Sequence, residues 1–504
     1  MLERYVKKIL SARVYDVASV TPLSLLPSLS QRLSGKVFAK REDLQPVFSF
    51  KLRGSYNRMA GLDAEARARG VVTASAGNHA QGVALAARAL GIRAHIVMGR
   101  NTPSIKITAV RNLGAHIILQ GDTYNDAAVH ARELEARQNL TYVHPFDDVD
   151  VIAGQGTIGM EILNQHTGPL DVIFVPVGGG GLIAGIAAYV KYLRPDVKII
   201  GVEAEGSACL RAAIDAGRRV TLPYETLDLF ADGVSVAQVG EETFKIARRY
   251  VDDVITVNTD EICAAIKDIY DDARCIAEPA GALGIAGMKK YRQRGDKFGT
   301  AIAILSGANV NFDRLRHISE RAELGEQRER ILGVTIPEKP GSFRRFCKAL
   351  GKRSVTEFNY RFAGGSDAHI YVGVQTSAAS DGVELVQSLR DMGYAVEDMT
   401  DNETAKLHVR HMVGGRAQEV VPELLYRFEF PERPGALSRF LNGLEGRWNI
   451  TLFHYRNHGA AWGRVLVGFE GTDADRRQLG QQLTAIGYRY WEETRNPAYQ
   501  MFLK

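Results

Sequence analysis

The sequence predicts an α/β domain built on a parallel sheet, followed by two smaller units that each combine helices and strands. Between Val71 and Val202, short β-branched runs alternate with alanine-rich stretches, which is the pattern of parallel strands joined by crossover helices. In the last third of the chain a segment occurs twice, with Pro340-Gly341 in the first copy and Pro434-Gly435 94 residues later. A chain of 504 residues is long enough for about two to four domains.

Six apolar runs are predicted to be buried strands, at residues 71–74, 94–98, 115–119, 172–177, 198–202 and 300–305. Helical stretches near residues 79–90, 104–112, 124–137 and 182–193 are predicted to be the crossover helices. Ligands of a parallel sheet bind at the carboxyl ends of its strands. We therefore expect a site where the segments 75–79, 178–181 and 306–309 follow their strands.

The repeated tail predicts two ferredoxin-like units. Each copy contains an amphipathic helix (343–350 or 437–444) and then a strand (358–361 or 453–456), in a predicted order of strand, helix, strand, strand, helix, strand. A densely charged stretch before the first copy is predicted to be a connecting helix. The predicted boundaries are 1–316 for the catalytic domain, 317–329 for the connecting helix, 330–415 for the first unit and 424–504 for the second.

The composition excludes several classes of protein. With 45% hydrophobic and 24% charged residues, a net charge of +5 and no lysine–arginine run, the sequence predicts neither disorder nor nucleic-acid binding. The four cysteines (Cys209, Cys263, Cys275 and Cys347) lack metal-ligand spacing and predict no metal site and no disulfide framework. No apolar run approaches the roughly 18 residues of a membrane span, and no signal sequence is recognisable at the start. We expect a cytoplasmic protein.

Lys51 is the candidate catalytic residue. It lies in Ser49-Phe50-Lys51-Leu52-Arg53-Gly54, and a lysine amine can hold an aldehyde cofactor as a Schiff base. The run from Gly178 to Gly181 follows an apolar strand, so its bare N–H groups can bind a phosphate. The run lacks the lysine and hydroxyl of a P-loop and the spacing of a dinucleotide-binding motif. The two features together suggest pyridoxal phosphate.

Three further features are open to two interpretations each. The segment Ser75-Ala76-Gly77-Asn78-His79 can bind a substrate carboxylate at a helix N-terminus, with Asn78 donating to the cofactor, or it is an ordinary turn capped by Asn78 or Ser75. Ser306, like Ser49, can contact the cofactor or be a turn residue. Glu203, at the end of a predicted strand, can bind a monovalent cation or cap a helix.

The motifs around Lys51, Asn78, the four glycines and Ser306 resemble those of the pyridoxal-phosphate lyases with the tryptophan-synthase β fold, and most closely those of threonine dehydratases. The duplicated tail resembles the two ACT-like regulatory units of the biosynthetic members. The resemblance implies that Lys51 carries the cofactor and that Phe50 also binds it. It implies that Asn78 contacts the ring oxygen and Ser306 the pyridine nitrogen, and that the phosphate is bound by Gly178, Gly179, Gly180, Gly181 and Leu182.

The resemblance also implies a reaction and its regulation. The expected reaction is deamination of L-threonine to 2-oxobutanoate and ammonia, with Lys51 removing the α-proton and a neutral Ser306 favouring β-elimination over transamination. Isoleucine is the expected inhibitor and valine its opponent. Tyr360 and Tyr455, at equivalent repeat positions, are expected to face effector pockets or to be ordinary strand aromatics. A homotetramer is expected.

Other functions remain open from the sequence. One alternative is a serine-preferring or broad hydroxy-amino-acid dehydratase, or a racemase, of the same fold. A second alternative is an amino-acid-sensing protein that has lost catalysis, against which the intact Lys51, Asn78 and Ser306 count. A nicotinamide dehydrogenase is a distant third.

Overall fold

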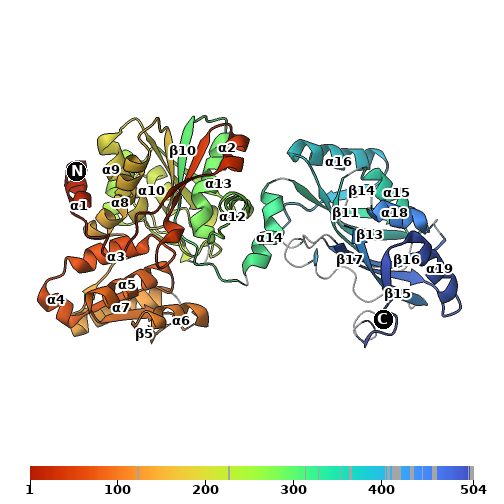
Figure 1. Cartoon of the computed structure of the whole chain (residues 1–504), viewed down its shortest axis with the longest axis horizontal. Helices are drawn as coiled ribbons and strands as arrows, with labels where there is room; N and C mark the ends of the chain where they lie inside the picture. Colours follow the sequence, from red (N-terminus) through yellow and green to blue (C-terminus); the bar gives the residue numbers. More distant parts are fainter. Residues whose placement is uncertain are drawn as a thin grey trace. The chain divides into compact units, whose positions relative to one another are not determined.

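The computed structural model describes residues 1–100, 102–121, 124–224, 227–312, 314–326, 328–351, 353–361, 366–402, 405, 409–410, 422–431, 436–444, 447–456, 462–497 and 499. The chain divides into two compact units, Met1–Gly325 and Glu326–Lys504 (Figure 1). Each unit has its own sheets and its own hydrophobic core. Pro434 and Gly435 of the repeat, and the predicted end of the first regulatory unit at residue 415, lie outside the described residues.

The first unit contains a six-stranded sheet in the order β1-β2-β10-β7-β8-β9. All neighbouring strands are parallel except β1, which is antiparallel to β2. The predicted strands at 172–177, 198–202 and 300–305 lie at its centre, and three strands that were not predicted complete it. Its strands are β1 (Leu23–Leu25), β2 (Lys36–Arg41), β7 (Val172–Pro176), β8 (Lys198–Ala204), β9 (Asp253–Val257) and β10 (Thr300–Leu305).

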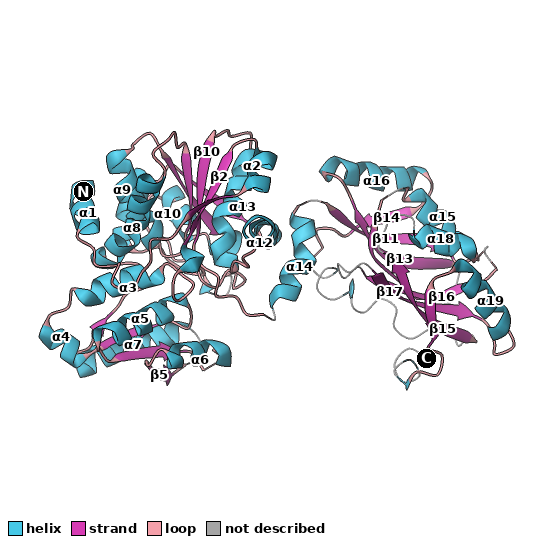
Figure 2. Ribbon diagram, viewed as in Figure 1, coloured by secondary structure: helices cyan, strands magenta, loops and turns pink. Residues whose placement is uncertain are grey.

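Both faces of this sheet are covered by helices, which explains why its strands are apolar throughout (Figure 2). Successive side chains of a strand point to opposite faces. Ile302 and Ile304 of β10 therefore pack in the core that α8 and α9 cover, whereas Ala301 and Ala303 pack in the core of α12 and α13.

A second, four-stranded parallel sheet has the order β5-β4-β3-β6. Its strands are β3 (Val71–Ala74), β4 (Ala94–Met98), β5 (His116–Leu119) and β6 (Thr141–Tyr142). The strands predicted from alternating apolar runs are thus all present, but they belong to two sheets and not to one. An apolar run indicates burial without indicating which sheet the strand joins, so the division was not visible in the sequence.

The helices of the first unit follow the predicted crossover pattern, because most of them connect parallel strands. They are α1 (Leu2–Leu10), α2 (Pro27–Leu33), α3 (Lys51–Ala60), α4 (Ala64–Arg69), α5 (Asn78–Leu90), α6 (Ser104–Asn112), α7 (Tyr124–Gln138), α8 (Val149–Gln165), α9 (Gly181–Leu193), α10 (Cys209–Asp215), α11 (Glu241–Tyr250), α12 (Thr259–Ala273), α13 (Pro279–Gln293) and α14 (Arg314–Gly325), with short 3₁₀ turns at Glu42–Leu44 and Glu205–Ser207.

Helix α13 packs unusually close to the large sheet because glycines line its contact face. A Cβ atom on Gly287 would lie 2.3 Å from a methyl group of Val202, and one on Gly284 would lie 3.2 Å from the Ala303 Cβ. The first turn of α13 approaches the loop after β10 in the same way, since a Cβ on Gly281 would lie 2.2 Å from the Gly307 carbonyl oxygen. This packing fixes the start of α13 against the carboxyl end of β10.

The second unit is one eight-stranded antiparallel sheet in the order β14-β11-β13-β12-β16-β17-β15-β18. Its two halves have the same order of elements, strand, helix, strand, strand, helix, strand, which confirms the two ferredoxin-like repeats. The first half is β11 (Glu329–Pro337), α15 (Ser342–Ala349), β12 (Val355–Arg361), β13 (Asp367–Gln375), α16 (Ala379–Asp391) and β14 (Ala395–Asp398). The second is β15 (Glu423–Pro431), α18 (Ala436–Gly443), β16 (Ile450–Arg456), β17 (Trp462–Glu470), α19 (Arg476–Ile486) and β18 (Arg489–Glu492).

The two halves join where β12 pairs with β16, and they share one core rich in aromatic side chains. At the junction the rings of Phe358 and Phe453 meet edge to face with their centroids 5.3 Å apart. In the part of the chain that the structure describes, no helix is long and apolar enough to cross a membrane.

Candidate active site

Lys51 begins α3, and its segment is tied to the loop that follows β10. The Phe50 N–H donates to the Ser306 carbonyl at 3.3 Å, and the Ala308 N–H donates to the Phe48 carbonyl at 2.9 Å. The structure therefore brings Lys51 and Ser306 together, although 255 residues separate them in the sequence. The Phe50 ring lies 5.2 Å from the Lys51 amine and packs against the core of α8 and α9.

The Lys51 amine lies in a largely enclosed space, where Nζ donates to the Pro145 carbonyl at 3.2 Å. Burial lowers the pKa of this amine to about 8, against an opposing effect of the Glu278 carboxylate. A lysine with a lowered pKa has a larger neutral fraction near neutral pH, and the neutral amine is the form that attacks an aldehyde or removes a proton.

The glycine run forms the turn between β7 and α9, and each of its glycines meets another part of the chain closely. A Cβ on Gly179 would lie 2.2 Å from the Phe146 ring, and one on Gly181 would lie 3.1 Å from Phe146. Gly180 has φ +92°, a conformation that favours glycine. A side chain has no room at Gly179 and little room at the other three positions, so glycine suits this turn and leaves its backbone bare.

The N–H groups of this turn are available to an anion. The Gly179 carbonyl accepts bonds from Thr243 Oγ1 at 2.8 Å and from the Gly240 N–H at 3.2 Å. Among the described residues, the N–H groups of Gly178 and Gly180 have no partner, and no side chain caps α9. The backbone and the helix dipole thus suit a phosphate group. The Leu182 side chain is buried in the core, so Leu182 can contribute only its backbone.

The segment 75–79 leads from β3 into α5, and no side chain caps this helix. Ser75 Oγ accepts a hydrogen bond from the Gly77 N–H at 3.3 Å, but Gly77 precedes the first residue of the helix. A Cβ on Gly77 would meet nothing within 4 Å, so the turn faces open space. Ala76 between them packs partly against the core of the small sheet. The interpretation as an ordinary capped turn is not what the structure shows, and the helix N-terminus is left for an anion.

The His79 side chain points away from this open space. Its Nε2 lies 2.9 Å from the Val143 carbonyl and its Nδ1 lies 3.4 Å from Ser55 Oγ. Burial, reinforced by the nearby Lys51 cation, lowers the pKa of His79 to about 3, so the ring is neutral and donates to Val143. His79 can therefore contact a substrate only through its backbone.

The Asn78 side chain has a partner that the sequence did not indicate. Asn78 Nδ2 donates to Glu278 Oε1 at 2.6 Å, across 200 residues. Burial raises the pKa of the Glu278 carboxyl to about 7. Glu278 directly precedes Pro279 at the start of α13, and in sequence this pair reads as an ordinary helix start. The sequence analysis also missed Pro145 and Phe146, which contact Lys51 and the glycine turn, because they lie in a loop without a recognisable motif.

Ser306 is buried, and its Oγ donates to the Ala280 carbonyl at 3.4 Å. Glu203 acts as a helix cap, because its two carboxylate oxygens accept bonds from the N–H groups of Leu210 at 2.8 Å and Arg211 at 2.9 Å. Within the described residues, no group of three or more metal-ligating side chains is found.

Comparisons with known proteins agree with this geometry. Residues 14–307 match the family model of pyridoxal-phosphate-dependent enzymes, and residues 320–409 and 414–503 each match the C-terminal regulatory domain of threonine dehydratase. The biosynthetic L-threonine dehydratase of Burkholderia multivorans is 54% identical over 503 residues, which cover 99% of both chains. This chain belongs to the threonine dehydratase family.

Other members of the threonine dehydratase family match over nearly the whole length of the chain. The biosynthetic enzyme of Escherichia coli K12 is 54% identical over 99% of this chain and 97% of its own length, and the mitochondrial enzyme of Saccharomyces cerevisiae is 49% identical over 99% and 89%. Among solved structures, a processed threonine deaminase from Solanum lycopersicum covers 64% of this chain and 93% of its own, with 50% identity and a TM-score of 0.62.

Pyridoxal phosphate is the cofactor of this family, and the residues of this chain fit it. The bare glycine turn with its free N–H groups suits the phosphate, and the enclosed Lys51 amine suits the aldehyde.

Proposed function

We propose that this protein converts L-threonine to 2-oxobutanoate and ammonia, and that Lys51 is its catalytic residue. The observation that carries this proposal is the enclosed Lys51 amine, held next to the Ser306 loop in a chain whose whole length matches threonine dehydratases. The reaction is balanced without an oxidant or a reductant, because threonine equals the sum of 2-oxobutanoate and ammonia.

Bound pyridoxal phosphate supplies an electron sink for the pair that is left when the Cα–H bond of the substrate breaks. The backbone from Gly178 to Leu182 would hold its phosphate, and the Lys51 amine would hold its aldehyde carbon. The neutral Lys51 amine would accept the α-proton of the substrate, for which its lowered pKa suits it.

The remaining residues orient the substrate and direct the reaction. The uncapped N-terminus of α5, from Ser75 to His79, binds the substrate carboxylate through backbone N–H groups. Asn78 would contact the ring oxygen of the bound cofactor, and Ser306 would contact its ring nitrogen. Because Ser306 carries no charge, it stabilises a protonated ring nitrogen less than a carboxylate would, and β-elimination is favoured.

The test is turnover by the purified protein with added pyridoxal phosphate. We expect 2-oxobutanoate and ammonia in equal amounts from threonine, and loss of both the bound-cofactor absorption band and turnover in Lys51→Ala. Lys36→Ala, which changes an exposed lysine, is the matched control. A Lys51→Ala protein that kept its keto-acid production would contradict the proposal.

A serine dehydratase or racemase is the competing enzyme, because a solved serine racemase from maize is 34% identical with a TM-score of 0.59 over 62% of this chain. The full-length relatives with regulatory domains favour threonine. Two measurements separate the threonine enzyme from its competitor: kcat/KM for threonine and for serine, and the proportion of D-serine after incubation with L-serine. A higher kcat/KM for serine, or interconversion of its enantiomers, would favour the competitor.

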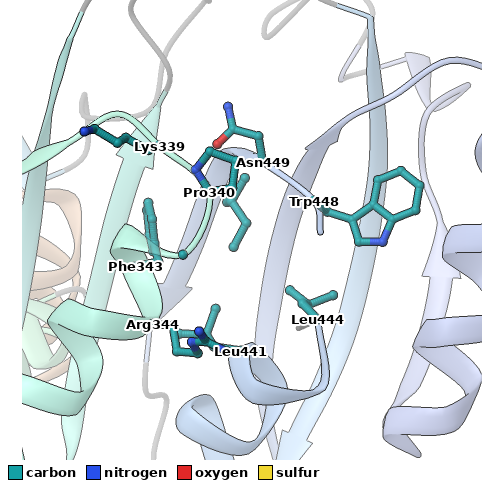
Figure 3. Close-up of a pocket in the computed structure, with 10 residues that line it drawn as sticks. Lys339, Pro340, Phe343, Arg344, Leu441, Leu444, Trp448 and Asn449 are labelled. Carbon is teal, nitrogen blue, oxygen red and sulfur yellow. The ribbon is translucent and has the colours of Figure 1, made fainter. Parts of the chain in front are cut away.

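We further propose that isoleucine inhibits the enzyme through the second unit and that valine opposes it. A pocket there combines both halves of the repeat (Figure 3). Phe343 comes from α15 of the first half, and Leu441 and Leu444 come from α18 and the residues after it. Lys339 and Arg344 supply positive charge at the same pocket. An apolar wall beside cations suits a branched-chain amino acid with its carboxylate.

Tyr360 and Tyr455 do not line this pocket. Both are core side chains, and the Tyr360 hydroxyl donates to the Glu338 carboxylate at 2.6 Å. Tyr360 lies behind the wall, because its ring contacts the Phe343 ring at 4.7 Å between centroids. The position of these tyrosines supports an indirect role at most, and the pocket residues are the better candidates for effector contact.

The regulatory proposal is tested by isoleucine inhibition curves. Arg344→Gln removes one pocket cation, so we expect a higher isoleucine concentration at half-inhibition. Lys348→Gln, an exposed change on the same helix, is the matched control. Equal shifts in both variants would contradict an effector site at this pocket.

We also propose a cytoplasmic homotetramer. Phe312 and Leu229 expose 81% and 67% of their side chains, which is unusual for large apolar residues and supports self-association. Light scattering of the purified protein tests the assembly.

A further inference from the structure

The Asn78 carboxamide is held at both ends by a chain of hydrogen bonds. Asn309 Nδ2 donates to the Val47 carbonyl at 2.8 Å and to Asn78 Oδ1 at 2.7 Å. Asn78 Nδ2 in turn donates to Glu278 Oε1 at 2.6 Å. These hydrogen bonds join the loop before Lys51, the loop after β10, the start of α5 and the start of α13.

The donor-to-acceptor direction of these hydrogen bonds follows from the two groups at their ends, the Val47 carbonyl and the Glu278 carboxyl. An amide has two ends of similar shape, so its orientation is decided by the polarity of its partners. The Val47 carbonyl can only accept, so the nitrogen end of Asn309 must face it. That nitrogen then meets the oxygen end of Asn78, and the nitrogen end of Asn78 must face Glu278. One N–H of the Asn78 carboxamide donates to Glu278, so the second carboxamide N–H can donate to another group.

Glu278 cannot move away from this contact easily. Its side chain is 5% exposed, and its N–H donates to the Gly307 carbonyl at 3.2 Å. A Cβ on Gly307 would lie 2.3 Å from Glu278 Oε1, so the carboxyl group lies directly against this loop. The close packing of α13 through Gly281 holds the same region from the other side.

We propose that Glu278 and Asn309 are positioning residues, which fix the Asn78 carboxamide so that it presents an N–H donor, and not its oxygen, to the ring oxygen of the bound cofactor. This inference rests on the proposed function. Neither positioning residue has to touch the cofactor, because both act through Asn78.

The contact does not depend on the charge of Glu278. Burial raises the pKa of this carboxyl to about 7, and the nearby charged groups are Lys51, Asp232 and Lys106. A carboxylate and the carbonyl oxygen of a carboxylic acid both accept a hydrogen bond. A glutamine side-chain oxygen accepts one as well, so Glu278→Gln should keep the orientation of Asn78, whereas Glu278→Ala removes the acceptor.

The experiment titrates the cofactor-free protein with pyridoxal phosphate and records affinity and the absorption maximum of the bound cofactor. For Glu278→Ala we expect about tenfold weaker binding and a shifted maximum, as for the loss of one hydrogen bond. For Glu278→Gln we expect affinity within about threefold of the natural protein and an unshifted maximum. Asn309→Ala removes the partner at the other end and should shift the maximum as Glu278→Ala does.

Asp268→Asn is the matched control, because Asp268 of α12 is a buried carboxylate that pairs with Arg32 of α2 and Lys289 of α13. It should leave the absorption maximum unchanged even where stability falls. An unshifted maximum in Glu278→Ala and Asn309→Ala, or equal damage in Glu278→Gln and Glu278→Ala, would overturn the inference. Failure of the natural protein to bind the cofactor would instead overturn the proposed function.

Discussion

Arg53 Nη1 lies 2.6 Å from Glu161 Oε1, and neither side chain is more than 3% exposed. The opposite edge of the same guanidinium binds Glu42 at 2.8 Å, and Lys40 binds Glu161 at 2.6 Å. Two cations, Arg53 and Lys40, thus balance two buried carboxylates. Arg53 lies only two residues after Lys51. Removing one member leaves a buried charge without its partner.

Arg53→Ala should therefore lower the free energy of unfolding by about 3–5 kcal/mol, because Glu42 loses its ion-pair partner. Arg58→Ala on the same helix is the control, since its pair with Asp148 is partly exposed and should contribute less than about 1 kcal/mol. Chemical denaturation of both variants measures the difference. A loss in Arg53→Ala no larger than that in Arg58→Ala would show that the buried network adds little.

Gly180→Ala should weaken cofactor binding more than tenfold, because it strains the turn that holds the phosphate. Gly180 has φ +92°, and a Cβ there would lie 3.0 Å from Thr243. Gly217 also has positive φ, at +64°, but a Cβ there would meet nothing within 4 Å. Both alanine variants should lose about 1 kcal/mol of stability, and only Gly180→Ala should lose affinity for pyridoxal phosphate. A titration that showed equal affinity for both would refute this role of the turn.

The site residues that the sequence predicted are those whose role follows from local pattern. Lys51, the glycine turn and the Ser306 loop are each recognisable from a motif of a few residues. The turn and the loop each follow a buried strand, and the carboxyl ends of parallel strands meet at one edge. The structure ties the residue before Lys51 to the Ser306 loop, because the Phe50 N–H donates to the Ser306 carbonyl.

The partners of these residues could not be predicted, because they come from distant segments. Glu278 is 200 residues from Asn78, and Pro145 is 94 residues from Lys51. Neither carries a local pattern of its own. Tyr360 shows the same limit in the second unit, since strand alternation does not reveal that Glu338 accepts a hydrogen bond from its hydroxyl.

His79 should make the protein less stable in acid. Its pKa is lowered to about 3 by burial, from an ordinary value of 6.5. Between these values the unfolded chain binds a proton that the folded chain does not, so stability falls as the pH falls through this window. His79→Gln keeps a hydrogen-bond donor for the Val143 carbonyl. Between pH 7 and pH 5 its free energy of unfolding should fall by about 2 kcal/mol less than that of the natural protein. Denaturation at the two pH values measures this, and identical losses would contradict it.

Lys51 should have a pH dependence of the same sign in the cofactor-free protein, but in a more alkaline window. Its pKa is lowered to about 8 from 10.5 by burial, so the folded state disfavours the charged amine. Below pH 8 the cost of burying the charged amine lowers the free energy of unfolding in full. Between pH 8 and pH 10.5 the unfolded chain still binds a proton that the folded chain has lost, so this cost disappears as the pH rises. Lys51→Met should therefore be more stable than the natural cofactor-free protein at pH 7, and the difference should shrink toward pH 10.5. Lys36→Met, at an exposed position, should show no such trend. A difference between Lys51→Met and the natural protein that stayed constant with pH would show that the amine is not enclosed in solution.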